Sequence, residues 1–286
     1  MRNLKTVLAA TAASMLSTAA LAADLPIAVP PPPVPVQPCC ASNDFGGWYL
    51  RGDVGFSNST IKSLRNNDSS LYTPLTSFNE TTQLDSAGIY DIGFGYQFNN
   101  WFRMDVTGQY RGSANFKGTD TFTGSAYGAT YYGVDNYNAS TSQWLVLANA
   151  YVDLGTWWCI TPFVGAGVGT ARVSMASFTD TGINTIPGSA YSVTSAANAS
   201  RWNFAWALHA GLAYHVNPNV TLEVAYSYVN MGNGVTGATA AYDGSFVNGQ
   251  PFTLHTITSN DVKVGLRWAI NPTPAYVPPP PLITKG

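Results

Sequence analysis

Residues Trp101 to Arg111 alternate strictly between two kinds of side chain, and this alternation limits the chain to few folds. The even positions from Phe102 to Tyr110 are apolar or small, whereas the odd positions from Arg103 to Arg111 are polar or charged. A period of two is that of a β-strand with two unlike faces. In a soluble sandwich the polar face of such a strand turns to water, and the chain carries many surface charges, but only 10% of this chain is charged. The segment therefore predicts the unit of a transmembrane β-barrel, with an apolar outer face and a polar inner face.

Seven other segments show the same pattern, and each is near or above the roughly 9 to 11 residues with which a tilted strand crosses a bilayer. The total of eight is even, as in single-chain bacterial barrels. No apolar run after Ala22 approaches the roughly 20 residues of a spanning helix. We therefore expect an all-β fold, an eight-stranded antiparallel transmembrane β-barrel. The predicted strands are Trp48–Ser57, Ala87–Phe98, Trp101–Arg111, Gln143–Leu154, Thr161–Val173, Arg201–His215, Val220–Val229 and Asn260–Ile270.

The connections between these segments alternate in length. Short turns belong on the periplasmic side of such a barrel and long loops on the extracellular side. Loops of this length are uncommon unless they are functional. Thr and aromatic residues alternate in parts of them, as from Thr119 to Tyr132, which favours strands that continue above the membrane. The short turns are Asn99–Asn100, Gly155–Ile160 and Val216–Asn219, and the four long loops are Asn58–Ser86, Gly112–Ser142, Ser174–Ser200 and Asn230–Ser259.

The two ends of the chain differ from this pattern. Residues 1–22 combine Arg2 and Lys5 with an apolar run and Ala-Leu-Ala at its end, which is typical of a cleaved secretory signal peptide. Residues 23–45 and 271–286 are rich in proline, and we expect extended periplasmic segments there. The predicted barrel then occupies residues 46–270. The net charge is −2 for the whole chain, so no nucleic-acid partner is indicated.

Four segments resemble a known family. They are GWYLRGDVGF (47–56), TPFVGAGVG (161–169), TLEVAYSYVNMG (221–232) and DVKVGLRW (261–268). These segments resemble the small outer-membrane β-barrel proteins of alphaproteobacteria, whose architecture is similar to that of the OmpA transmembrane domain and OmpX. The resemblance implies a location in the bacterial outer membrane, and its motifs identify no reaction.

The inward positions of the predicted strands carry charges of both signs. An eight-stranded barrel has an interior just wide enough for side chains to fill it, so these charges are expected to pair with one another. In particular, we expect Arg103 to pair with Asp153, and Glu223 with Arg267. The alternative is a narrow water-filled channel. The predicted lumen network consists of Arg51, Asp53, Asp91, Arg103, Asp105, Arg111, Asp153, Arg201, Glu223, Asp261, Lys263 and Arg267.

An enzymatic function finds little support. His209 and His215 both point inward but lie about 20 Å apart along their strand, at about 3.3 Å per residue, so they cannot share a metal or a proton. His255 lies alone in the last long loop. No nucleophile with a neighbouring base is evident at the outer rim. We expect no catalytic residue, metal or cofactor, and keep a lipid-modifying enzyme as the third alternative.

The sequence favours a structural role: a barrel that supports the envelope, with surface loops available for adhesion or host contact. Tyr127, Tyr131, Tyr132 and Tyr137 lie among small polar residues in the second loop, which is typical of adaptable binding surfaces and equally of exposed β-ribbons. The tripeptide Arg51-Gly52-Asp53 we interpret as part of the lumen network. Expected partners are outer-membrane lipids, lipopolysaccharide, the outer-membrane assembly machinery and a surface ligand. A low-conductance porin-like channel is the second alternative.

The three cysteines are an odd number in a compartment that oxidises thiols. Cys39 and Cys40 precede the first strand, and Cys159 lies in a short turn, so all three are expected on the periplasmic side. The residues between Cys40 and Trp48 are long enough to reach beneath the barrel. A disulfide from Cys39 or Cys40 to Cys159 is therefore possible. A Cys39–Cys40 bridge, free thiols and a link to another chain remain open.

Overall fold

The computed structural model describes residues 46–270, except 73, 127 and 187–190. Within these residues the secondary structure is almost entirely β-strand, with one short 3-10 helix. The described part of the chain has no helix long and apolar enough to span a membrane. The elements are β1 (Gly47–Asn66), η1 (Ser69–Tyr72), β2 (Leu75–Leu84), β3 (Ala87–Gln97), β4 (Phe102–Ala126), β5 (Ala129–Asp153), β6 (Ile160–Asn184), β7 (Tyr191–Ala196), β8 (Ala199–His215), β9 (Val220–Val235), β10 (Thr239–Ala241) and β11 (Phe252–Ala269).

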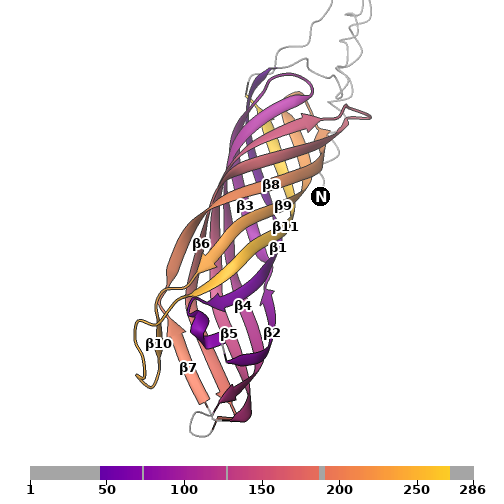
Figure 1. Ribbon diagram of the computed structural model, residues 1–286. Helices are drawn as coiled ribbons and strands as arrows, with labels where there is room; N and C mark the ends of the chain where they lie inside the picture. Colours follow the sequence, from indigo (N-terminus) through magenta and orange to yellow (C-terminus); the bar gives the residue numbers. More distant parts are fainter. Residues whose placement is uncertain (1–45, 73, 127, 187–190, 271–286) are drawn as a thin grey trace, which may run out of the picture. The chain divides into compact units, whose positions relative to one another are not determined.

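Eight of these strands close into a ring, as predicted. The order around the ring is β1, β3, β4, β5, β6, β8, β9 and β11, and β11 pairs again with β1. Every pairing is antiparallel (Figure 1). Because the ring is closed, it presents no free strand edge to the lipid, where an unpaired backbone group would be costly.

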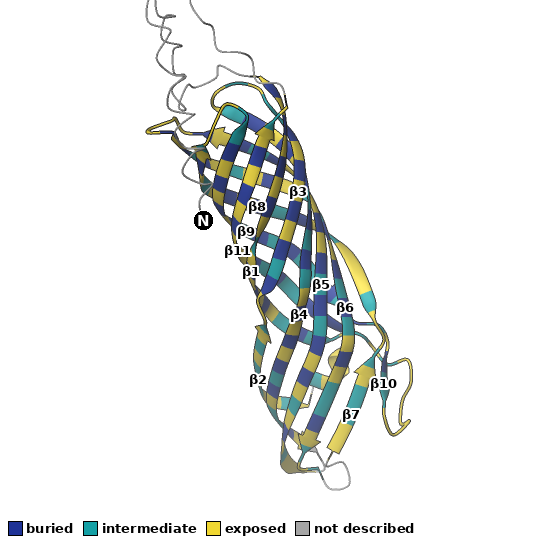
Figure 2. Cartoon of the chain, turned by 180° about the vertical axis from the view of Figure 1, so that it is seen from behind, coloured by how far each residue is buried: buried dark blue, intermediate teal, exposed yellow. Residues whose placement is uncertain are grey.

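The outer face of the ring is a band of exposed apolar side chains. Phe56 is 73% exposed and Ile92 is 72% exposed, whereas their sequence neighbours are mostly turned inward. Figure 2 shows this alternation of buried and exposed residues along each strand. Aromatic side chains gather at the end of the band nearer the short turns, where Trp48 stacks on Phe94 with ring centroids 4.7 Å apart. Such rings are enriched at membrane–water interfaces.

The strands continue well beyond this apolar band, as the alternating Thr and aromatic residues predicted, so the four long connections consist largely of β-strand. β4 and β5 pair without a break in direction up to Ala126 and Ala129, which reduces the predicted loop 112–142 to a tight turn. β2 continues the line of β3 along β4, and β7 continues that of β8 along β6. Thr, Tyr and Val, which favour strands, are frequent in these segments. We call the described residues of 58–86, 112–142, 174–200 and 230–259 the extension.

The interior of the ring is filled in two tiers. Polar and charged side chains occupy the half nearer the short turns, and an apolar core begins in the half nearer the extension and continues into the extension. Inward positions of several strands form this core, which includes Leu145 and Leu147 of β5, Val173 of β6, and Leu254 of β11. The apolar tier was not predicted, because the predictions for the lumen concerned only the charges among the inward residues.

Candidate functional site: the filled lumen and the exposed sheet face

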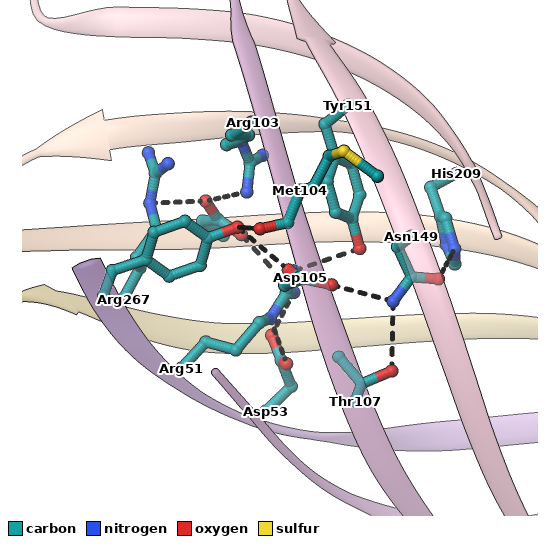
Figure 3. Close-up of polar contacts among 12 residues, drawn as sticks. Arg51, Asp53, Arg103, Met104, Asp105, Thr107, Asn149, Tyr151, His209 and Arg267 are labelled. Atoms are coloured by element: carbon teal, nitrogen blue, oxygen red, sulfur yellow. Dashed lines mark hydrogen bonds and ion pairs between the residues drawn. The ribbon is translucent and has the colours of Figure 1, made fainter. Parts of the chain in front are cut away.

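Arg51 lies at the centre of the polar tier. Its guanidinium Nη2 is 2.9 Å from Asp53 Oδ1 on the same strand, and its Nη1 is 3.1 Å from Asp105 Oδ2 on β4. A third carboxylate, that of Glu223 on β9, lies 3.4 Å from Nη2. All four side chains are almost fully buried. Figure 3 shows Arg51 between Asp53 and Asp105. The tripeptide that contains Arg51 and Asp53 therefore faces the lumen, as predicted, and is not presented to a partner.

The two ion pairs predicted from strand positions are both present. Arg103 Nε lies 3.3 Å from Asp153 Oδ1, and Arg267 Nε lies 3.2 Å from Glu223 Oε1. The structure adds a link between them, because Arg103 Nη1 is 3.3 Å from the same Glu223 oxygen. The Arg103 guanidinium also lies over the ring of Tyr151, 4.3 Å from its centroid. A buried cation is stabilised by such a ring in addition to its ion pairs.

A second group of charges lies higher in the polar tier. The Arg111 guanidinium forms a two-pronged pair with Asp261, with Nη1 3.1 Å from Oδ1, and both side chains are fully buried. Lys263 Nζ lies 3.0 Å from Asp91 Oδ2. Gln109 connects the two pairs, because its amide donates to Asp91 and its carbonyl oxygen accepts from Arg111. Eleven of the twelve predicted network residues are thus buried in the lumen.

The prediction was wrong for Arg201. Its side chain is exposed, and among the described residues it forms no ion pair. Arg201 has the inward parity of β8, but it lies above Trp206 and Asn230, where the β8–β9 pairing ends. A side chain at an inward position of a strand is buried only where neighbouring strands flank that position on both sides. The buried network therefore contains five cations and six carboxylates.

Neutral groups occupy the remaining positions around these charges. Asn149 donates to Asp105 Oδ1 over 2.8 Å, and Tyr49 donates its hydroxyl to Asp105 Oδ2 over 3.1 Å. His209 is held between Ser227 and Asn149, at 2.8 and 3.2 Å. Both ring nitrogens of His209 are thus engaged in hydrogen bonds. No cluster of His, Cys, Asp and Glu that could hold a metal ion occurs within the described ranges.

Glycines on β6 make room for this packing. A Cβ atom added to Gly165 would lie 2.4 Å from the ring of Tyr151, and one added to Gly167 would lie 2.0 Å from Asn149 Oδ1. The large side chains of β5 therefore occupy the space that β6 leaves open. The Tyr151 ring is available to Arg103 for the same reason.

The cysteine prediction falls partly outside the described residues. Cys159 lies between β5 and β6, is buried, and is disulfide-bonded. Cys39 and Cys40 lie outside the described residues, so the choice between them stays a prediction. The free-thiol alternative is wrong for Cys159.

The outer face of the extension carries an apolar row that the sequence analysis missed. Val134 of β5 pairs with Ile183 of β6, and Ile183 pairs with Tyr191 of β7, so the three side chains lie side by side across three strands. Ile183 is 60% exposed and Tyr191 is 67% exposed. Tyr132, also 60% exposed, lies two residues from Val134 on the same face. We call Tyr132, Val134, Ile183 and Tyr191 the apolar row.

The surroundings of the apolar row are polar but uncharged. Thr121 pairs with Val134 on one side, and the next positions along the strands carry Asn136 and Thr181. Among the described tyrosines of the predicted second loop, Tyr132 is the exposed one on this face, whereas Tyr137 points inward and is 5% exposed. Tyr127 lies outside the described residues. The sequence could have shown that Tyr132 and Tyr137 face opposite sides, because the alternation from Gly133 to Ala139 continues the period of β5.

Comparison with known proteins gives consistent matches. Residues 8–269 match the family described as outer membrane protein beta-barrel domain. An uncharacterised protein of Brucella suis is 31% identical over 278 residues, which cover 88% of this chain and 93% of that protein. A putative adhesin of Rickettsia felis is 29% identical over 222 residues, which cover 76% of this chain and 87% of that protein. The crystal structure of OprG from Pseudomonas aeruginosa aligns with 79% of this chain and 98% of its own, with a TM-score of 0.46 and 11% identity.

Proposed function

Because the chain belongs to the outer membrane protein β-barrel family, we propose that its barrel is a closed anchor in the bacterial outer membrane and that its extension is an adhesive surface. The barrel has its lipid-facing band in contact with outer-membrane lipids and lipopolysaccharide, and reaches the membrane through the outer-membrane assembly machinery. The extension then stands outside the cell and binds a surface ligand. In this role the protein supports the envelope and catalyses no reaction.

The observation that carries this proposal is the filled interior. A diffusion channel needs a continuous polar path, whereas here a buried ion-pair network and an apolar core follow one another along the axis. A buried and paired network is stable only while water is largely excluded from it. These features argue against the porin-like alternative. The lipid-modifying alternative lacks support because His209 is already engaged on both ring nitrogens.

The apolar row supports an adhesive role for the extension. Exposed apolar side chains rimmed by polar residues are typical of interaction surfaces. The residues of the lipid-facing band are instead apolar because they contact lipid. The row lies beyond that band, so lipid contact does not account for it. Tyr132 and Tyr191 supply large rings at low entropic cost, as in other binding surfaces. Relatives in Rickettsia are named putative adhesins.

Adhesion of bacteria that display the protein tests this proposal. A non-adherent Gram-negative strain that displays the wild type on its surface is expected to bind cultured epithelial cells. The variant Val134→Ser/Ile183→Ser/Tyr191→Ser is expected to lose most of this binding, at least tenfold. Leu71→Ser is the matched control, because Leu71 is 54% exposed in η1, away from the apolar row. Equal binding by the triple variant and the wild type would contradict the proposal.

Conductance of the purified protein in a planar bilayer tests the closed anchor separately. We expect no steady open events, because the two tiers leave no polar path. Regular single-channel openings would instead support the porin-like alternative, whatever the adhesion result.

A further inference from the structure

Acidic side chains gather on the inner wall of the extension, behind the face that carries the apolar row. Glu80 of β2 pairs in register with Asp120 of β4, and Asp120 pairs with Asp135 of β5. Asp180 of β6 pairs with Tyr137, which is the next inward residue of β5 after Asp135. Four carboxyl groups from four strands therefore lie along one stretch of the wall.

Positive charge is scarce along this stretch. In the described part of the extension, Arg65 of β1 is the cation that reaches the wall, and it already forms an ion pair with Glu80. On β7, the position opposite Asp180 carries Thr194, and β11 presents Phe252 to Tyr137. Lys117 of β4 is exposed on the opposite face. Asp120, Asp135 and Asp180 thus have no cation of their own among the described residues.

Two of these carboxyl groups, those of Asp120 and Asp180, each have one buried oxygen without a hydrogen-bond partner among the described residues. Asp120 is only 2% exposed, and its Oδ2 accepts a hydrogen bond of 3.1 Å from the Tyr137 hydroxyl. Its Oδ1 is buried and unpartnered among the described residues, as is Oδ1 of Asp180. A buried ionised carboxylate without partners is unfavourable, whereas a protonated carboxyl carries no charge and supplies a donor for a neighbouring oxygen. Protonation of these carboxyl groups would therefore remove the unfavourable buried charge.

The electrostatics of the wall agree with its geometry. Burial, together with repulsion from Asp135 and Asp120, raises the pKa of Asp180 to about 8. Burial, with repulsion from Glu80, raises the pKa of Asp120 to about 7. Burial raises the pKa of Asp135 to about 6. Burial also raises the pKa of Tyr137, so its hydroxyl stays a donor throughout this range. The three aspartates change charge between about pH 6 and 8.

We propose that the extension is a pH-responsive element. Its strands β4, β5 and β6 are held together firmly when Asp120, Asp135 and Asp180 are protonated in acid, and less firmly when these groups ionise at neutral to alkaline pH. A group whose pKa is higher in the folded state than in the unfolded state stabilises the fold fully below the unfolded value. That stability is lost as pH rises through the folded value. For the three aspartates, the loss of this stability begins above about pH 4 and is complete above about pH 8. The apolar row lies on the other face of the same strands and is held most firmly in acid.

Hydrogen exchange of the refolded full chain in lipid bilayers tests this proposal. After correction for intrinsic exchange rates, we expect the protection of residues 116–126 and 129–140 to fall at least tenfold from pH 5 to pH 8. Residues 143–153, in the membrane part of β5, serve as the internal reference and are expected to keep their protection. In the variant Asp120→Asn/Asp180→Asn, the protection of the extension is expected to be nearly the same at both pH values.

The control is Asp85→Asn, which removes an exposed carboxyl from the same extension. It is expected to keep the full pH dependence of the wild type. Should the double variant fail to show the heat-modifiable migration of a folded barrel, Asp135→Asn replaces it, with a partial loss of the pH dependence expected. The proposal is overturned by equal protection of the wild-type extension at both pH values. It is also overturned if Asp120→Asn/Asp180→Asn, or Asp135→Asn in its place, keeps the full pH dependence.

Discussion

At the scale of single residues, the polar tier contains pairs of different kinds. Glu223 is shared among Arg51, Arg103 and Arg267, so removing any one of them leaves the others to compensate. Arg111 and Asp261 instead form one two-pronged pair in which neither side chain is exposed. The pair therefore offers the clearest measurement of what a lumen ion pair contributes to stability.

We expect Arg111→Met to lower the free energy of unfolding by about 3–5 kcal/mol, because it leaves the Asp261 carboxylate buried without its partner. Asp261→Leu is expected to have a similar effect. The double variant should lose clearly less than the sum of the two single variants, since the charges are then removed together. Urea-induced unfolding in lipid vesicles measures all four proteins. Strict additivity would show that the two side chains do not interact.

Gly232 offers a second test at this scale. Its φ of +76° lies in the left-handed region, and an added Cβ would lie 2.7 Å from Asn203 Cβ on β8. Asn203 bridges the two strands there by donating its side-chain amide to the Asn233 carbonyl oxygen over 2.8 Å. We expect Gly232→Ala to destabilise the barrel by about 1–3 kcal/mol.

Gly108→Ala is the control, because nothing lies within 4 Å of a Cβ added at Gly108. Its free energy of unfolding in the same vesicles is expected to match that of the wild type. A similar loss in both variants would point to a general cost of alanine in these strands and not to the conformation of Gly232.

At the scale of elements, the β4–β5 hairpin has a membrane part and an extension part that rely on different contacts. The membrane part is paired to β3 on one side and β6 on the other. The upper part is paired to β2 and to the upper part of β6, and it carries Asp120, Val134 and Tyr137. The ring can therefore close without the upper part of the hairpin.

We expect a protein in which residues 119–136 are replaced by Asn-Gly to remain a folded barrel. Gly118 and Tyr137 are paired partners, and Asn-Gly is the preferred sequence for a two-residue hairpin turn. The truncated protein should keep its heat-modifiable migration in gels but lose adhesion, since Tyr132 and Val134 are gone. Loss of the folded band would show that the ring depends on its extension.

The turn between β5 and β6 carries the disulfide prediction. Cys159 is disulfide-bonded, and Cys39 and Cys40 are the other cysteines of the chain. We expect peptide mass mapping of the non-reduced, alkylated protein to yield a cross-linked peptide that joins the region of Cys39 and Cys40 to Cys159. A peptide that joins two copies of Cys159 would contradict this prediction and indicate a link between chains.

At the scale of the whole barrel, closure makes the fold resistant to detergent. Each ring strand is hydrogen-bonded on both sides along its membrane part, and no edge is left from which unfolding can begin. We expect unheated and boiled samples to migrate differently in detergent gels, and the far-ultraviolet circular dichroism spectrum to be that of β-sheet. Equal migration, or a helical spectrum, would contradict the fold.

The period-two pattern of the sequence was sufficient to predict the number of membrane strands, their outer faces and most of the lumen charges, because side-chain parity is a local property of a strand. The ion pairs Arg103–Asp153 and Glu223–Arg267 followed from counting residues from the short turns. The alternation of side chains along one strand does not show where the neighbouring strand ends. For this reason Arg201 was placed in the lumen, and the strands expected above the membrane were predicted without their bounds or partners.

Only the tertiary structure brings together residues far apart in the chain. Arg111 and Asp261 are 150 residues apart, and the apolar core joins inward residues from β1 to β11. The row from Val134 to Tyr191 and the wall of Asp120, Asp135 and Asp180 depend on the register among three strands. Register is fixed by the closure of the ring and by its stagger, which are properties of all strands together. The sequence by itself therefore determined which side chains of each strand face inward or outward. The closed ring decided which other residues each side chain contacts.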